Sequence, residues 1–177
     1  MSRIRSIIKG SGHYLPSLLV KNSSFEKNTF HNEDGTLFPS SSSEIIQKFH
    51  IITGIKERRY LTEDLQSSDM AAIASEKAIL DSGIDRESID HIIIAHNFGD
   101  IQSDKSIPEM MPSLGAKVKN KLGIKNPNCV CYDIIFGCPG WVQAMIQADV
   151  YIKSGYAKTC LVVGTESLSR MVDPTDR

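Results

Sequence analysis

The sequence has almost no net charge, no basic stripe and no long hydrophobic run. Its 177 residues include 20 lysines and arginines against 21 aspartates and glutamates, which leaves a net charge of −1. Nucleic-acid binding therefore has little electrostatic support. The longest apolar runs, such as Ile92–Ala95 and Leu161–Val163, are far too short to cross a bilayer, and none of greater length follows Met1–Arg5. We therefore expect no membrane span and no secretory signal, with a cytoplasmic location as the default.

Metal-binding patterns are missing as well. The four cysteines form no Cys-x-x-Cys pair, and none of the five histidines stands at zinc-finger spacing, so we expect no metal site. Three of the cysteines are expected to be small buried hydrophobes, as cytosolic cysteines usually are: Cys129, Cys131 and Cys160. The histidines are interpreted as structural or surface residues: His13, His31, His50, His91 and His96.

What the sequence does have is the composition and periodicity of a folded α/β domain. Hydrophobic residues make up 41% and charged residues 23% of the chain, which is the globular range. Continuous β-branched or alternating runs predict strands over residues 4–8, 90–95, 128–134 and 159–163. Apolar spacing and capping patterns predict helices over residues 41–49, 70–82, 112–122 and 140–154. Residues 15–39 are expected to be irregular, and residues 97–108 to form a mobile surface loop. This alternation predicts a three-layer α/β architecture with a central sheet.

Cys138 stands where the strand that ends at Ile134 gives way to the helix that begins at Gly140. Unpaired N–H groups and the positive end of the helix dipole gather at such a junction, where they favour a thiolate and can donate to an oxyanion on a thioester. The same position also suits a structural cysteine. A papain-like cysteine protease is a further alternative, opposed by the Cys-Pro-Gly-Trp spacing and by the lack of any histidine after His96.

Several motifs in order identify a family resemblance. Residues 132–177, which include YIKSG at 151–155, LVVGTE at 161–166 and DPTDR at 173–177, closely resemble β-ketoacyl-acyl carrier protein synthase III, the initiating condensing enzyme of bacterial fatty acid synthesis. Two earlier motifs agree with that family, GSGHYLP at 10–16 and TGIKER at 53–58. The resemblance covers nearly the whole chain, apart from residues 19–43 and an apparent insertion at 98–107.

The resemblance implies a thiolase-like fold, in which two similar α/β halves pack as five layers, αβαβα, usually in a homodimer. Residues 1–177 would be the N-terminal thiolase-like domain, and the family's catalytic His and Asn would lie in the second half. The implied activity is acyl transfer followed by a decarboxylating Claisen condensation, in which an acyl-CoA primer and malonyl-acyl carrier protein are joined through an acyl-cysteine in fatty acid or related lipid or polyketide biosynthesis. No metal or cofactor is implied beyond the coenzyme A thioester, which is a substrate. The chain alone is expected to lack the condensation step.

Four residues inherit roles from the resemblance. Cys138 would be the nucleophile, and Arg177 would stack on the adenine of coenzyme A, a role that suits a planar guanidinium. Met111 would reach across the dimer into the partner's acyl pocket, and Leu168 would line the pocket.

The chain also departs from the family pattern. Lys48 stands where the family has an adenine-stacking Trp, and Ile52 where it has an Arg. Gly137 precedes the cysteine and Pro139–Trp141 follow it, where the family often has Ala and Ala-Gly-Phe. These departures predict a divergent paralogue with altered coenzyme A recognition and a different primer.

Two alternatives stay open at this point. One is another thiolase-fold condensing enzyme, such as a type III polyketide synthase or a hydroxymethylglutaryl-CoA synthase. The other is a non-catalytic assembly module that contributes to a dimer or serves a separate partner half. In either case a half that normally packs against another is expected to expose a large apolar face and to self-associate.

Overall fold

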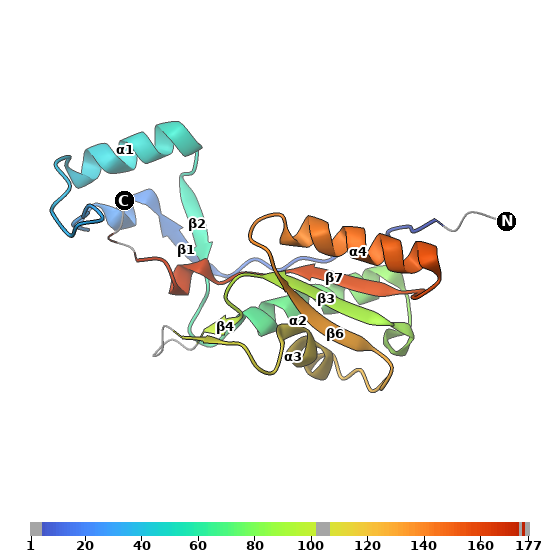
Figure 1. Ribbon diagram of the computed structural model, residues 1–177. Coiled ribbons are helices and arrows are strands. Elements are labelled where there is room, and N and C mark those ends of the chain that lie inside the picture. Colours follow the sequence, from blue (N-terminus) through green and yellow to red (C-terminus); the bar gives the residue numbers. More distant parts are fainter. Residues whose placement is uncertain (1–4, 102–106, 174, 176–177) are drawn as a thin grey trace. The chain divides into compact units, whose positions relative to one another are not determined.

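The computed structural model describes residues 5–101, 107–173 and 175. The chain divides into a larger unit, Met1–Leu15 with Glu63–Ser167, and a smaller unit, Pro16–Thr62 with Leu168–Arg177 (Figure 1). The expectation that residues 1–177 form one thiolase-like domain stays a prediction.

A three-stranded parallel sheet forms the centre of the larger unit. Strand β3 (His91–His96) lies in the middle, between β6 (Val130–Ile135) and β7 (Cys160–Gly164). All six residues of β3 are buried, which explains the uninterrupted β-branched run in its sequence, because a central parallel strand is covered on both faces.

Helices cover both faces of this sheet (Figure 1). On one face, α2 (Ser67–Ser82) and α3 (Leu114–Lys121) pack over a core that includes Ile92 and Ile94. On the other face, α4 (Gly140–Ser154) packs through Ala144 and Ala148 against Ile93. Ile93 faces the opposite side of the sheet from Ile92 and Ile94, because successive side chains of a strand alternate between its two faces. The predicted three-layer α/β architecture is confirmed.

Helix boundaries follow the local capping signals. Helix α1 (Ser42–Thr53) begins at a capping box in which the Ser41 hydroxyl accepts from the Glu44 N–H and the Glu44 carboxylate accepts from the Ser41 N–H. Helices α1, α2 and α4 each end at a glycine with a positive φ: Gly54, Gly83 and Gly155. The bounds predicted for α4 are those observed, whereas α1 runs four residues beyond the predicted end at Phe49.

The predicted first strand, Ile4–Ile8, is wrong for the described residues 5–8, which have no regular structure. Ile7 and Ile8 are about three-quarters exposed, so their apolar pattern does not reflect burial in this sheet. The segment after them instead lies directly on α2. A Cβ at Gly12 would stand 2.2 Å from the Ala74 carbonyl oxygen, and one at Gly10 would stand 2.6 Å from the Ala78 carbonyl oxygen. Only glycine permits this approach of two backbones.

The regions expected to be irregular contain short strands. In the smaller unit, β1 (Leu18–Lys21) pairs antiparallel with β2 (Glu57–Tyr60). In the larger unit, β4 (Asp100–Ile101) pairs with β5 (Pro108–Glu109), while residues 102–106 lie outside the described residues. Three short 3₁₀ segments complete the described elements: η1 (Asn22–Phe25), η2 (Arg86–Ser88) and η3 (Leu168–Arg170).

The smaller unit is organised around Arg58 on β2. Its guanidinium lies 4.9 Å from the ring centroid of Phe25 and 5.4 Å from that of Phe49, and it also donates to the side-chain oxygen of Asn22. A cation between two aromatic faces stabilises this arrangement by cation–π attraction. Arg58 therefore contributes to the fold of this unit.

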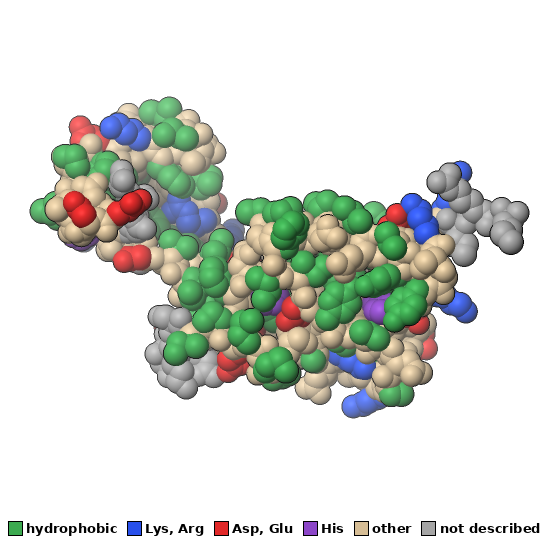
Figure 2. Space-filling model, viewed as in Figure 1, with side chains coloured by type: hydrophobic (Ala, Val, Ile, Leu, Met, Phe, Trp, Pro, Cys, Tyr) green, Lys and Arg blue, Asp and Glu red, His purple; other side chains and the backbone are tan. Residues whose placement is uncertain are grey.

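The outer face of α4 is apolar and uncovered. Val142, Ile146 and Val150 are each more than half exposed, and hydrophobic side chains gather along this helix in Figure 2. Single exposed apolar residues are common, but a row at helical spacing indicates a contact surface. Within the described ranges, no helix has the length and hydropathy required to cross a membrane.

Candidate functional site at the carboxyl edge of the sheet

Cys138 lies in the turn that joins β6 to α4, at the carboxyl edge of the parallel sheet. Gly137 adopts a φ of 63° and its carbonyl oxygen accepts from the Gly140 N–H at 3.0 Å, which closes the turn and directs the chain into α4. Cys138 is exposed within this turn, and Pro139 occupies the N-cap. The cysteine is thus beside the first turn of a helix, where N–H groups lack intrahelical partners.

The other three cysteines are in unfavourable surroundings for a nucleophile. Cys129 is buried, and burial raises the pKa of its thiol to about 12. Burial likewise raises the pKa of Cys160 to about 11 and raises that of Cys131. A buried thiol with a raised pKa stays protonated and unreactive at neutral pH. Among the four cysteines, exposure therefore favours Cys138 as the reactive one.

The first turn of α4 is seated closely on the sheet. A Cβ at Gly140 would lie 3.3 Å from the Ala95 Cβ, so the helix begins almost in contact with β3. At the end of β7, a Cβ at Gly164 would lie 3.2 Å from Cδ1 of Trp141. The Trp141 ring therefore covers the end of β7, and its position depends on the absence of a side chain at Gly164.

A partly buried carboxylate lies five residues before Cys138. Asp133 accepts from the backbone N–H of Leu114 at 2.7 Å and of Gly115 at 2.8 Å, at the start of α3. His96 Nε2 lies 3.1 Å from the Asp133 carboxylate. Burial opposes ionisation of Asp133, but the nearby His96 ring and then the two backbone donors outweigh it, so the pKa of Asp133 is lowered.

This pair was not identified from the sequence, in which His96 is interpreted as a structural or surface residue. No signal in the sequence identifies it, because the two residues meet only through the register of β3 against β6, which places them on the same face of neighbouring strands.

The other predicted site residues are placed as follows. Met111 precedes α3 in the larger unit and is 84% exposed. Leu168 begins η3 in the smaller unit and is about half exposed. Arg177 lies outside the described residues. The roles predicted for these residues and for Cys138 stay predictions.

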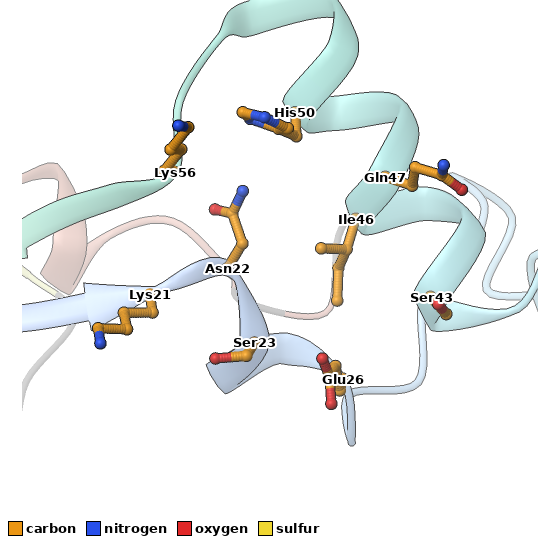
Figure 3. Close-up of a pocket in the computed structure, with 9 residues that line it drawn as sticks. All are labelled: Lys21, Asn22, Ser23, Glu26, Ser43, Ile46, Gln47, His50 and Lys56. Carbon is orange, nitrogen blue, oxygen red and sulfur yellow. The ribbon is translucent and has the colours of Figure 1, made fainter.

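A pocket of about 520 Å³, lined mainly by residues of polar type, lies in the smaller unit (Figure 3). In the close-up, His50 and Lys56 lie at one end and Glu26 at the other. The pocket is lined by Lys21, Asn22, Ser23, Glu26, Ser43, Ile46, Gln47, His50 and Lys56. Cys138, Met111 and Leu168 do not line this pocket. Lys48 and Ile52 of α1 do not line it either. Across the described ranges, no group of three or more His, Cys, Asp or Glu side chains could hold a metal ion.

Comparison with known proteins gives a consistent result. The family model of 3-oxoacyl-[acyl-carrier-protein (ACP)] synthase III matches residues 132–177. Beta-ketoacyl-[acyl-carrier-protein] synthase III 1 of Vibrio parahaemolyticus is 40% identical over 172 residues, which are 97% of this chain and 47% of that protein. The corresponding synthase III of Ruegeria pomeroyi is 36% identical, over 98% of this chain and 46% of that protein. The chain therefore spans about half the length of the curated relatives it matches.

Solved structures agree with the sequence matches. The crystal structure of 3-oxoacyl-[acyl-carrier-protein] synthase III from Aquifex aeolicus has a TM-score of 0.76 at 32% identity. The matched region covers 98% of this chain and 48% of the Aquifex chain. The synthase III from Thermus thermophilus has the same TM-score at 31% identity, with 97% and 46% covered. The fold is thus one half of the thiolase-like fold of these enzymes.

Proposed function

The chain is a relative of the N-terminal half of 3-oxoacyl-[acyl-carrier-protein] synthase III, and on that basis we propose that it carries the acyl-accepting cysteine of a condensing enzyme. The observation that carries the proposal is the exposure of Cys138 in the turn before α4, in contrast to the buried or partly buried state of the other three cysteines. A nucleophile must be reached by its substrate, and Cys138 meets that condition at the edge of the sheet where ligands of parallel α/β folds bind.

The proposed reaction is a decarboxylating Claisen condensation in two stages. The Cys138 thiolate attacks the thioester carbonyl of an acyl-CoA, and coenzyme A leaves as its thiol, so an acyl-cysteine thioester forms. Malonyl-acyl carrier protein then loses carbon dioxide, and the resulting enolate carbon attacks the acyl-cysteine. The Cys138 sulfur leaves, and a β-ketoacyl-acyl carrier protein is released. The second stage requires the His and Asn that the family places in its second half.

The surroundings of Cys138 support the first stage. The start of α4 offers backbone N–H groups to the oxyanion that forms when the thiolate attacks a thioester. Gly137 leaves room for an acyl chain beside the sulfur, because a Cβ there would meet no atom closer than Pro139 Cδ at 3.9 Å. The reaction needs no metal or cofactor other than the coenzyme A thioester. The thiolate is the nucleophile, coenzyme A leaves as a thiol, and loss of carbon dioxide generates the enolate.

We assign the remaining residues by the same proposal. Met111 would enter the acyl pocket of a homodimer partner, which accords with its large exposure. Leu168 would line the pocket and Arg177 would stack on adenine. Lys48 and Ile52 are predicted to weaken or alter coenzyme A recognition, since Ile52 is 81% exposed on α1 and offers neither a charge nor an aromatic plane. The enzyme would act in the cytoplasm, in fatty acid or related lipid or polyketide biosynthesis.

The test uses the full product of the coding sequence with a panel of acyl-CoA primers of different length and branching. Formation of β-ketoacyl product from each primer and malonyl-acyl carrier protein is followed by mass spectrometry. We expect product with at least one primer, its loss in Cys138→Ser and its retention in Cys160→Ser, because Cys160 lies within the sheet. Equal product from the Cys138→Ser variant would contradict the proposal.

A further inference from the structure

Buried His96 and partly buried Asp133 form a pair on the α3 side of the sheet. Strand register places Asp133 directly opposite Ile94, so His96, two residues further along β3, is its diagonal neighbour on the same face. The His96 side chain is only 4% exposed, and its Nε2 lies 3.1 Å from Asp133 Oδ2. The imidazole is therefore shielded from solvent and lies beside a carboxylate that is itself 15% exposed.

Asp133 connects this pair to two segments of the proposed site. Its carboxylate accepts from the N–H groups of Leu114 and Gly115, which follow Met111 by three and four residues. In the other direction along the chain, β6 continues from Asp133 for two residues and then enters the turn that carries Cys138. The carboxylate thus fixes the end of the strand that leads to the cysteine and the start of the helix that follows Met111.

The approach of α3 to β6 leaves little freedom for this arrangement. A Cβ at Gly115 would stand 3.0 Å from the Tyr132 backbone nitrogen and 3.4 Å from Asp133 Oδ1. The helix start therefore lies directly on the strand backbone. Two N–H groups at a helix N-terminus also stabilise an anion through the helix dipole. The side chain of His96 supplies a further polar partner to this carboxylate, from β3.

We propose that His96 is a positioning residue for Cys138, which acts by holding the Asp133 carboxylate and thereby fixing the end of β6 and the turn that follows it. The inference rests on the proposed function of Cys138. His96 does not contact a substrate in this role, and its effect reaches the thiol through Asp133 and the backbone of residues 134–137. Loss of the imidazole would leave Asp133 with a cavity beside it, and the end of β6 would shift.

Strand β3 supplies a matched control. His91 begins the same strand, is 5% exposed, and lies against Tyr151 and Tyr156 at ring-centroid distances of 5.0 and 5.4 Å. It stands at the opposite edge of the sheet from Cys138. His91→Leu and His96→Leu therefore remove the same buried ring from the two ends of one strand. His96→Gln is the conservative variant, because its amide nitrogen can donate to Asp133.

The experiment measures two rates at Cys138 in the full product of the coding sequence, with melting temperature recorded for every variant. One is acylation by the best acyl-CoA primer, read as intact mass in a single turnover. The other is alkylation by iodoacetamide, read on the peptide that contains Cys138. We expect His96→Leu to lower the acylation rate by about tenfold or more, which corresponds to a loss of about 1.4 kcal/mol of transition-state stabilisation. His96→Gln should recover most of the rate, and His91→Leu should leave it unchanged.

Each outcome decides a separate question. If wild-type and His96→Leu proteins are acylated at the same rate, or if His91→Leu loses as much activity as His96→Leu, the positioning role is wrong. If the wild-type protein is not acylated by any primer, the proposed function fails, and alkylation then decides the inference alone. A changed alkylation rate in His96→Leu with no change in His91→Leu would support it, and equal rates in all three proteins would overturn it.

Discussion

Gly137→Ala is expected to disturb the turn of Cys138 through the backbone alone. Gly137 adopts a φ of 63°, and a Cβ there would meet no closer atom than Pro139 Cδ at 3.9 Å. The substitution therefore introduces no steric clash, and its effect comes from placing an L-residue in the left-handed region. That conformation costs about 1–2 kcal/mol, from which the lower entropy of the unfolded alanine chain removes part, about 0.4–1 kcal/mol. The net expected destabilisation is about 1 kcal/mol.

Gly155→Ala is the matched control for this substitution. Gly155 ends the same helix with a φ of 76°, and a Cβ there would meet no atom within 4 Å. The two variants should therefore lose similar stability in urea unfolding, about 1 kcal/mol each. They should differ at the cysteine: in Gly137→Ala the turn relaxes away from the left-handed region and moves the thiol, so the alkylation rate of Cys138 by iodoacetamide changes severalfold. Gly155→Ala should alkylate as the wild type does.

Two results would refute this reasoning. A Gly137→Ala protein with wild-type stability and wild-type alkylation would show that the turn does not need the left-handed conformation. A Gly155→Ala protein with the same altered alkylation would show that loss of stability, and not the geometry of the turn, governs access to Cys138.

Three other features of the structure can be tested by substitution. Because the folded pKa of Asp133 is lowered, its carboxylate contributes stability at neutral pH that is lost as the pH falls through that pKa; Asp133→Asn should therefore cost about 2 kcal/mol near pH 7 and less near pH 3 in urea unfolding, and an equal cost at both would contradict this. Gly12→Ala places a Cβ 2.2 Å from the Ala74 carbonyl oxygen and should lower the free energy of unfolding by about 1–3 kcal/mol, whereas unchanged stability would show that the segment does not lie on α2. The 177-residue chain should self-associate through Val142, Ile146 and Val150, so light scattering should report a mass above the monomer that falls in Ile146→Lys, and a monomeric wild-type chain would exclude it.

Local signals were sufficient to predict most of the core elements. The capping box at Ser41 and the glycine after α4 determine helix ends within a few neighbouring residues, so they are visible in sequence. The buried β3 strand was predicted because a short, continuous β-branched run is typical of a strand covered on both faces. The location of Cys138 between a strand and a helix followed from the same two patterns, and its exposure agrees with the role predicted for it.

Features that depend on pairing between distant segments were not predicted. Strand β1 pairs with β2 across about forty residues, and neither strand has an alternating pattern strong enough to identify it alone. Residues 5–8 have a strand-like composition but no regular structure, because composition does not supply a partner strand. The contact of His96 with Asp133 depends on the register of β3 against β6, which only the folded sheet defines.

The central claim is that Cys138 accepts an acyl group from coenzyme A. The direct measurement is to incubate the full product of the coding sequence with a panel of acyl-CoA primers, digest it, and locate any added acyl mass among the four cysteine-containing positions. We predict an acyl group on Cys138 with at least one primer and none on Cys129, Cys131 or Cys160, whose thiols have raised pKa values. An unmodified Cys138 with every primer, or an acyl group on another cysteine in its place, would contradict this claim.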